Sequence, residues 1–341
     1  MRILLATDAW LPQVNGVVRT WMTSITKLRE WGHEVAVIEP NQFPGLPCPF
    51  YPEIRLCLPL QGKIVRTIRA FDPDVIHIAT EGPIGFAVRL FCRRRGLFFT
   101  TTYHTKFPEY LQRMLFLPAG ISYGVMRRFH RRSSTIMVAT PSLEAELRAR
   151  GFQQPMKRWS RGVDLTLFHP RPKKPSDWPR PHLLYVGRVS KEKSIEDFLK
   201  VRAFGTKIIV GDGPIRERLA KEYPDAQFLG YRTGEALAEC YADADLFVFP
   251  SVTDTFGLVM IEALASGLPV AARPVVGPID IITQPSIGAL DHDLNVAVDR
   301  ALREGNPAEC ARVGREYTWD NCTRQLLGNF VNTHTGRLAY S

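Results

Sequence analysis

The fold of this chain is decided by residues 246–263, which read LFVFPSVTDTFGLVMIEA. The first four residues are apolar and favour extended structure, so they predict a short strand that is buried on both faces. Pro250 ends that strand, and a loop of small and polar residues follows it. Gly257 then precedes an apolar run that predicts a helix containing Glu262. This strand–loop–helix pattern is typical of a parallel sheet covered by helices.

Other apolar runs alternate with helical stretches at the spacing expected of βαβ units. We expect strands in the first half at residues 2–7, 34–39, 74–78, 97–102 and 135–139. We expect strands in the second half at residues 183–187, 207–211, 226–229, 246–249 and 268–272. Most of them lack strict polar alternation, as parallel strands covered on both faces do. The sequence therefore predicts the α/β fold class.

A proline-rich segment separates the two series of strands. Residues 168–181 contain five prolines, which exclude a helix interior or a central strand. We therefore predict two doubly wound, Rossmann-like domains that face a central cleft. The expected boundaries are 1–165 for the N-terminal domain, 166–181 for a linker, 182–320 for the C-terminal domain and 321–341 for a C-terminal helix that could pack on the first domain.

The chain has the composition of an ordinary globular protein, but its charge is uneven. The formal net charge is +10, and residues 1–165 hold 23 of the 44 basic residues but only 12 of the 34 acidic ones. Within residues 89–132, ten residues are basic and only Glu109 is acidic. A basic field this local attracts an anionic partner, either lipid headgroups or nucleic acid.

The remaining bulk features predict a cytoplasmic protein. The chain opens on a strand-like run, so we expect no leader, and no apolar stretch is long enough for a membrane span. The six cysteines form no C-x-x-C pair, which favours free thiols in a reducing compartment. No metal-ligand motif is present, and we expect no metal and no cofactor.

Glycines and cations follow several of the expected strands. Gly16 and Val17 open the first helix, where backbone N–H groups favour a phosphate, although a plain strand–helix turn explains them equally well. Gly187 and Arg188 end a strand and Lys193 follows, so the two cations could hold a diphosphate or could be solvated surface charges. The candidates after the next strand are Gly211 and Gly213, which permit close backbone approach or form a simple turn.

Two carboxylates flank the helix that begins near Gly257. Asp254 lies before the helix, where it could accept hydrogen bonds from sugar hydroxyls, and Glu262 lies inside it, where it could bind a ribose diol. The alternative makes Asp254 an N-terminal cap and Glu262 a solvated helix residue. His104 follows another expected strand and so lies at the functional edge of the sheet, although a lone histidine is more often structural.

Taken in order, these pieces resemble the retaining glycosyltransferases of family 4, which have the GT-B fold. The resemblance covers about residues 1–325. Its decisive part runs from Asp254 to Glu262 and matches the family's E-x-x-x-x-x-x-x-E motif with aspartate at the first position. Four other segments also recur in that family: 15–19, 161–164 with Phe168, 187–188 with Lys193, and 211–214.

The resemblance implies a role for each matching residue. His104, Arg188, Lys193 and Asp254 would be catalytic: His104 would orient the donor sugar, the two cations would neutralise the leaving diphosphate, and Asp254 would contact sugar hydroxyls. The donor-binding set would be Gly16, Val17, Gly187, Arg188, Lys193, Gly211, Gly213, Asp254, Thr255, Phe256, Gly257, Leu258 and Glu262. The family needs no divalent metal, and the leaving phosphate is thought to accept the acceptor's proton during same-face attack.

An apolar and basic region suggests the second substrate. Residues 109–117 present large apolar side chains, and the helix near 120–132 ends with four arginines on one broad face. We expect this region to contact the inner face of an anionic membrane through Arg93, Arg94, Arg95, Arg113, Met114, Phe116, Arg127, Arg128, Arg131 and Arg132. The alternative is a core-facing apolar stripe with a solvated basic back. A peripheral, membrane-associated enzyme that glycosylates a lipid is favoured.

The sequence leaves the substrates and some other classes open. We expect diacylglycerol to be glycosylated from UDP-glucose or UDP-glucuronate, and the alternative is a GDP-mannose-dependent mannosyltransferase acting on a lipid or glycan. A nucleotide-binding protein that has lost catalysis, an epimerase and a nucleic-acid binder are further alternatives. No nucleic-acid motif with interleaved aromatic residues accompanies the basic half, so we expect no nucleic-acid partner.

Overall fold

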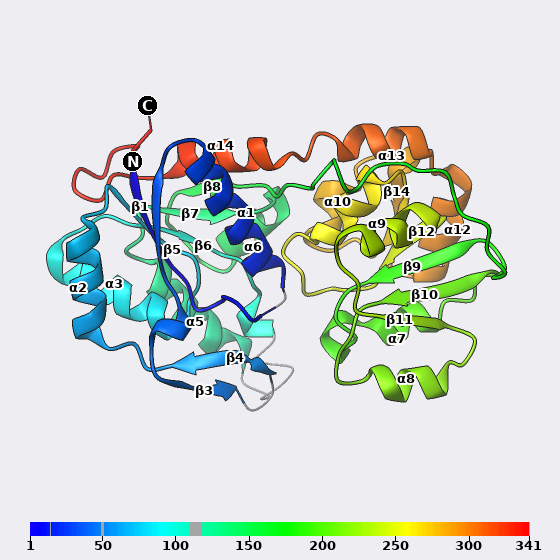
Figure 1. Ribbon diagram of the computed structural model, residues 1–341, viewed down its shortest axis with the longest axis horizontal. Coiled ribbons are helices and arrows are strands. Elements are labelled where there is room, and N and C mark those ends of the chain that lie inside the picture. Colours follow the sequence, from blue (N-terminus) through cyan, green and yellow to red (C-terminus); the bar gives the residue numbers. More distant parts are fainter. Residues whose placement is uncertain (14, 49–50, 110–117, 341) are drawn as a thin grey trace. The chain divides into compact units, whose positions relative to one another are not determined.

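The computed structural model describes residues 1–13, 15–48, 51–109 and 118–340, and side chains are described for these except 48 and 51–54. The chain forms two compact units. Unit 1 contains Met1–Arg161 and Trp319–Ser341, and unit 2 contains Gly162–Thr318. Each unit is an α/β domain built on its own six-stranded sheet (Figure 1).

The sheet of unit 1 is entirely parallel, with the strand order β2-β1-β5-β6-β7-β8. Its strands are β1 (Arg2–Ala6), β2 (Glu34–Ile38), β5 (Val75–Ile78), β6 (Thr100–Thr102), β7 (Thr135–Val138) and β8 (Met156–Arg158). Its helices are α1 (Gly16–Glu30), α2 (Gln61–Phe71), α3 (Pro83–Arg95), α5 (Ala119–His130), α6 (Pro141–Ala149) and α14 (Trp319–Asn329). A separate antiparallel hairpin pairs β3 (Gly45–Cys48) with β4 (Tyr51–Cys57).

Helix α1 provides the apolar face on which the C-terminal helix α14 packs. The Asn15 side chain accepts hydrogen bonds from the first turn and so starts the helix. Trp21, Ile25 and Leu28 then recur at helical spacing and are buried. They pack in one apolar cluster with residues of α14, including Leu326. The C-terminal helix therefore completes the core of unit 1.

Unit 2 has a second parallel sheet, with the strand order β11-β10-β9-β12-β13-β14. Its strands are β9 (His182–Val186), β10 (Thr206–Val210), β11 (Gln227–Gly230), β12 (Leu246–Phe249), β13 (Val270–Ala272) and β14 (Gly288–Leu290). Its α-helices are α7 (Ile195–Leu199), α8 (Arg216–Glu222), α9 (Gly234–Asp243), α10 (Leu258–Ala265), α11 (Pro278–Ile281), α12 (Leu294–Glu304) and α13 (Pro307–Gly314). Short 3₁₀ turns lie at Lys191–Lys193 and Pro285–Ile287, and another lies at Pro40–Gln42 of unit 1.

The proline-rich segment, which we predicted as a linker at 166–181, is grouped with unit 2. Arg180 bonds Asp245 at 2.8 Å, and Lys173 also pairs with that carboxylate. The Lys174 ammonium group lies 2.8 Å from Glu239 of α9. These ion pairs hold an irregular segment against α9 and the turn that follows it, which the proline count alone does not reveal.

All ten predicted strands are present, although β6 and β13 are shorter than expected by more than one residue. Strand β6 begins only at Thr100 and strand β13 only at Val270. The hairpin β3–β4, β8 and β14 are additional strands that the sequence reasoning missed. Among the helices that the structure describes, each is too short or too polar to cross a bilayer.

Candidate functional site

The strand order of unit 2 reverses between β9 and β12. The chain runs outward from β9 to β10 and β11, then returns to β12 on the other side of β9. The loops that follow β9 and β12, residues 187–193 and 250–257, therefore flank the switch point of a parallel sheet. In open α/β sheets, ligands bind at such a point beyond the carboxyl ends of the strands.

Two predicted site residues from these loops meet directly. The Lys193 ammonium group donates to Asp254 Oδ1 at 2.6 Å, and each side chain is 22% exposed. The Thr253 hydroxyl also donates to the backbone carbonyl of Glu192 at 3.2 Å. The loops are therefore joined next to the switch point by residues that lie 61 positions apart in the chain.

The alternative interpretation of the two carboxylates is wrong. Gly257, not Asp254, is the N-cap of α10, and no side chain caps that helix end. Gly257 has φ +92°, a left-handed backbone conformation that favours glycine. Glu262 is only 2% exposed and is therefore not a solvated helix residue.

Glu262 is oriented by a residue that the sequence reasoning missed. The hydroxyl of Tyr241 in α9 donates to Glu262 Oε2 at 2.9 Å, and Tyr241 is fully buried. Its ring packs edge-on against Phe168, with ring centroids 5.5 Å apart. Because Tyr241 and Glu262 lie on different helices and 21 residues apart, no sequence spacing connects them.

The predicted glycines allow two loops of unit 2 to run side by side. A Cβ on Gly211 would lie 1.9 Å from the carbonyl oxygen of Gly187, and one on Gly213 would lie 2.3 Å from that of Val189. Gly187 and Gly211 also have positive φ angles, of 156° and 141°. The structure thus gives these glycines a packing role in the loop that presents Arg188.

The other predicted donor residues of unit 2 lie on the same loops. Thr255 and Phe256 are buried, whereas Leu258 at the start of α10 and Arg188 are partly exposed. The Tyr185 hydroxyl donates to the backbone carbonyl of Arg188 at 2.7 Å and fixes that turn. These residues therefore lie on the two loops that flank the switch point.

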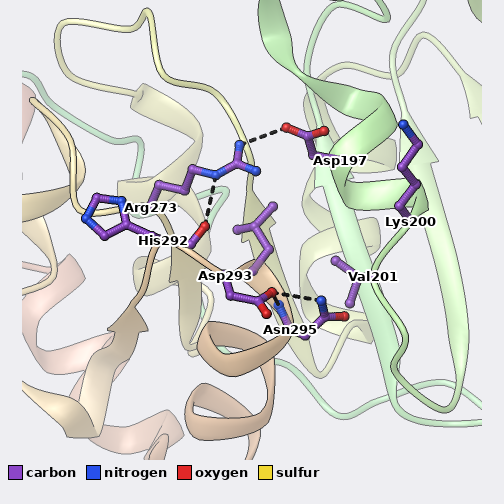
Figure 2. Close-up of a pocket in the computed structure, with 8 residues that line it drawn as sticks. Asp197, Lys200, Val201, Arg273, His292, Asp293 and Asn295 are labelled. Atoms are coloured by element: carbon purple, nitrogen blue, oxygen red, sulfur yellow. Dashed lines mark hydrogen bonds and ion pairs between the residues drawn. The ribbon is translucent and has the colours of Figure 1, made fainter.

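A hollow of about 320 Å³ lies near the ends of β13 and β14, and none of the predicted donor residues lines it (Figure 2). Arg273 points across it and donates to Asp197 at 2.9 Å, and the same nitrogen bonds the Pro250 carbonyl at 3.1 Å. Asp293 accepts from the backbone and side chain of Asn295. The polar groups of this hollow therefore tie three chain segments together.

In unit 1, the strand order reverses between β1 and β5, and an acid occupies that point. The Asp8 carboxylate accepts from the Thr80 hydroxyl at 2.9 Å and from the backbone N–H groups of Ile84 and Gly85 at 2.8 and 3.2 Å. Burial raises the pKa of Asp8 to about 6 despite these bonds. The first turn of α3 thus binds the protein's own carboxylate.

The predicted phosphate contact at the start of α1 is partly used by the protein itself. The Asn15 side chain accepts from the backbone N–H groups of Val17 and Val18, both at 3.0 Å. The Val17 N–H predicted to face a phosphate is therefore directed to Asn15. Contact between the donor and Gly16 stays a prediction.

His104 is held in a buried aromatic cluster of unit 1. The Trp21 indole N–H donates to its Nε2 at 2.9 Å, and the Arg161 guanidinium lies 3.2 Å from its Nδ1. Burial and the Arg161 charge keep the pKa of His104 well below its usual range, so the ring is neutral. A role in orienting a substrate stays a prediction, whereas proton transfer by this ring is disfavoured.

The predicted membrane residues lie at the ends of two helices of unit 1. Arg93, Arg94 and Arg95 are exposed at the end of α3, and Arg128, Arg131 and Arg132 are exposed at and just beyond the end of α5. Arg127 is partly exposed and donates to the Arg150 carbonyl at 2.9 Å. Arg113, Met114 and Phe116 lie outside the described residues.

Comparisons with known proteins agree with this architecture. The model of "Glycosyltransferase Family 4" matches residues 14–167, and that of "Glycosyl transferases group 1" matches residues 180–302. The chain is 32% identical to a GDP-mannose-dependent alpha-mannosyltransferase of Mycobacterium tuberculosis, over 97% of this chain and 96% of that protein. It is 26% identical to alpha-monoglucosyldiacylglycerol synthase of Streptococcus pneumoniae, over 89% of this chain and 78% of that protein.

A solved structure supports the fold alone. Sucrose-phosphate synthase from Thermosynechococcus elongatus matches with a TM-score of 0.76 and 22% identity, over 95% of this chain and 96% of that one. Two parallel-sheet α/β domains of this kind define the GT-B class of glycosyltransferases. Within that class, this chain belongs to glycosyltransferase family 4, and it is an enzyme that transfers a glycosyl group.

Proposed function

We propose that this enzyme transfers a hexosyl group from a nucleotide sugar to a hydroxyl group of a membrane lipid, with retention at the anomeric carbon and without a divalent metal. The observation that carries the proposal is the Lys193–Asp254 pair, which joins the two loops at the switch point of unit 2. A cation for a phosphate and a carboxylate for sugar hydroxyls are thereby held together beside Arg188.

The Lys193–Asp254 pair suggests how the nucleotide-sugar donor binds. A diphosphate carries more negative charge than one carboxylate, so it competes with Asp254 for the Lys193 ammonium group. Once Lys193 and Arg188 bind the diphosphate, Asp254 can accept hydrogen bonds from sugar hydroxyls. Glu262, which Tyr241 orients, would bind the ribose. The anomeric carbon then loses its bond to the phosphate oxygen, bonds the acceptor oxygen, and the acceptor's proton passes to the phosphate.

The relatives change which donor is favoured. Sequence reasoning favours UDP-glucose or UDP-glucuronate, whereas the mycobacterial relative that matches nearly the whole chain is named for GDP-mannose. We therefore propose GDP-mannose as the first donor to test. UDP-glucose stays the second candidate.

A lipid acceptor is supported by charge and by one relative. The streptococcal relative is named as a synthase of monoglucosyldiacylglycerol. The exposed arginines at the ends of α3 and α5 give unit 1 a cationic surface. Burial, together with the charges of Arg93, Arg128, Arg131 and Arg132, lowers the pKa of Arg89. Each such cation contributes about 1 kcal/mol at an anionic bilayer. We propose that this surface holds the enzyme at a membrane that contains the acceptor.

The test is a donor-by-acceptor screen with labelled GDP-mannose and UDP-glucose, and with diacylglycerol and a total lipid extract as acceptors. Arg188→Ala and Lys193→Ala should each lower turnover at least about 100-fold, because two charges that stabilise the leaving group are removed one at a time. Lys191→Ala is the matched control, since Lys191 is an exposed cation in the same 3₁₀ turn. If Arg188→Ala and Lys193→Ala turn over the donor as fast as Lys191→Ala does, Arg188 and Lys193 do not bind the diphosphate as proposed.

Two further readouts address the stereochemistry and the metal. The product formed at early times should have the same anomeric configuration as the donor in its proton NMR spectrum. Turnover should survive an excess of EDTA, since cationic side chains would neutralise the leaving group. An inverted product, or a loss of activity that Mg²⁺ or Mn²⁺ restores, would contradict this part of the proposal.

A further inference from the structure

The hairpin β3–β4 of unit 1 presents a row of leucines to solvent. Leu46 and Leu56 are directly paired in the antiparallel register, so their side chains lie on the same face. Leu46 is 75% exposed, and Leu56 is 49% exposed. Leu58 and Leu60 continue the alternation beyond β4 and are 66% and 49% exposed. We call these four residues the leucine ridge.

The opposite face of the hairpin is anchored in the core. Cys57, which lies between two ridge residues, is only 6% exposed and packs in an apolar cluster with Phe43 and Ile64. The backbone N–H of Leu58 donates to the Pro44 carbonyl at 2.8 Å, so the chain stays extended past the end of β4. The ridge is therefore held outward by a fixed backbone register, since a shift of one residue would exchange the two faces.

Four basic residues adjoin the ridge in the sequence. From Arg55 to Phe71 the sequence contains four basic residues and no acidic one. Lys63, Arg66 and Arg69 are exposed on α2, which directly follows Leu60. Within the described part of the chain, none of these four cations forms an ion pair with a carboxylate. The Lys63 ammonium group lies 5.3 Å above the Phe43 ring and donates to the Gln42 carbonyl at 2.6 Å.

We propose that the leucine ridge is a membrane-insertion edge, which enters the headgroup region of an anionic bilayer while Arg55 and the cations of α2 contact the lipid phosphates. Large apolar side chains that gather on one surface usually mark a binding face. Apolar residues beside exposed cations match the two layers of an anionic lipid surface. This inference rests on the proposed lipid acceptor only for its biological purpose, since membrane binding can be measured without turnover.

A second copy of the chain fits the ridge less well than a bilayer does. A symmetric dimer through the ridge would bring the four cations of each copy close to those of the other copy. Residues 55–71 themselves contain no carboxylate to offset that repulsion. An anionic lipid surface satisfies the leucines and the cations at the same time. The ridge consists of other residues than the arginines at the ends of α3 and α5, so its contribution can be tested by separate substitutions.

The experiment measures flotation of the full chain with vesicles of phosphatidylcholine containing about one third phosphatidylglycerol. The variant Leu46→Ser/Leu58→Ser should lower the partition coefficient about tenfold or more, because two large apolar side chains no longer enter the interface. Phe204→Ser is the control, since Phe204 of unit 2 is the most exposed large apolar residue in the described part of the chain, at 80%. That control should partition like the original chain.

Two measurements keep the outcomes distinct. Thermal unfolding of the double variant should match that of the original chain, because both leucines are exposed. Its turnover of a short-chain acceptor dispersed in detergent micelles should also be unchanged, whereas turnover of an acceptor embedded in vesicles should fall. If the chain has no activity on any lipid, the proposed function fails, but a partition that depends on the ridge still supports the insertion edge.

Two results would overturn the inference. One is an equal partition of the double variant and the original chain into anionic vesicles. The other is a concentration-dependent dimer in analytical ultracentrifugation that the two serines abolish, because the ridge would then be an interface between copies. The variant Lys63→Gln/Arg66→Gln measures the electrostatic contribution to vesicle binding. It should lower the fraction of the chain that floats with anionic vesicles at low salt and have little effect at high salt.

Discussion

The hydroxyl group of Tyr241 offers the sharpest single test of the donor site. It donates to Glu262 Oε2 at 2.9 Å, and neither residue is more than 2% exposed. The ring of Tyr241 packs edge-on against Phe168 and beside Phe247. Tyr241→Phe keeps these ring contacts and removes one hydrogen bond, so the substitution isolates the orientation of the carboxylate.

The expected magnitude follows from that hydrogen bond. A buried hydrogen bond to a carboxylate contributes about 1.5–3 kcal/mol, and the loss divides between folding and ligand binding. We expect about 1.4 kcal/mol of it in the binding of a ribonucleoside diphosphate, which corresponds to about a tenfold rise in Kd. The rest should appear as a lower free energy of unfolding.

Isothermal titration calorimetry with paired ligands makes the prediction specific. Tyr241→Phe should weaken binding of the ribonucleoside diphosphate about tenfold and leave binding of its 2′-deoxy analogue nearly unchanged, because only the former uses the oriented carboxylate. Tyr223→Phe, a partly buried tyrosine at the end of α8, is the matched control. Equal losses for both ligands, or a loss for neither, would refute the idea that Tyr241 positions Glu262 for the ribose.

Two more predictions concern the loops of each unit. Because burial raises the pKa of Asp8 to about 6 from 3.8, the folded chain binds this proton more tightly than the unfolded chain does. Stability should therefore rise by about 1 kcal/mol between pH 7 and pH 5 through this group, and chemical denaturation of Asp8→Asn should show a flatter pH profile; an unchanged slope would contradict it. Gly211→Ala would place a Cβ 1.9 Å from the Gly187 carbonyl at φ +141°, so it should destabilise unit 2 by about 1–3 kcal/mol and weaken donor binding. A normal melting temperature for this variant would show that the two loops can separate freely.

Local sequence patterns predicted the two series of parallel strands, because the apolar runs report which backbone segments are covered by helices. The glycines at 187 and 211 could be named as candidates because turn positions restrict the residue type. Asp254 and Glu262 could be named because carboxylates in and before that helix can accept hydrogen bonds from sugar hydroxyls. Short strands escaped this reasoning. Residues 45–48 read GLPC, which contains a proline and shows no alternation, yet they pair in the hairpin that carries the leucine ridge.

The sequence by itself determined the α/β class, the strand–loop–helix unit at residues 246–263 and the residue types beside it, because these depend on neighbours along the chain. Only the tertiary structure decided that Lys193 bonds Asp254, that Tyr241 orients Glu262 and that the proline-rich segment belongs to unit 2. Each of those contacts joins separate elements, and its partners are chosen by the order of strands in a sheet and the packing of helices upon it. Apolar periodicity records that a face is buried, but it does not record which residue the face will meet.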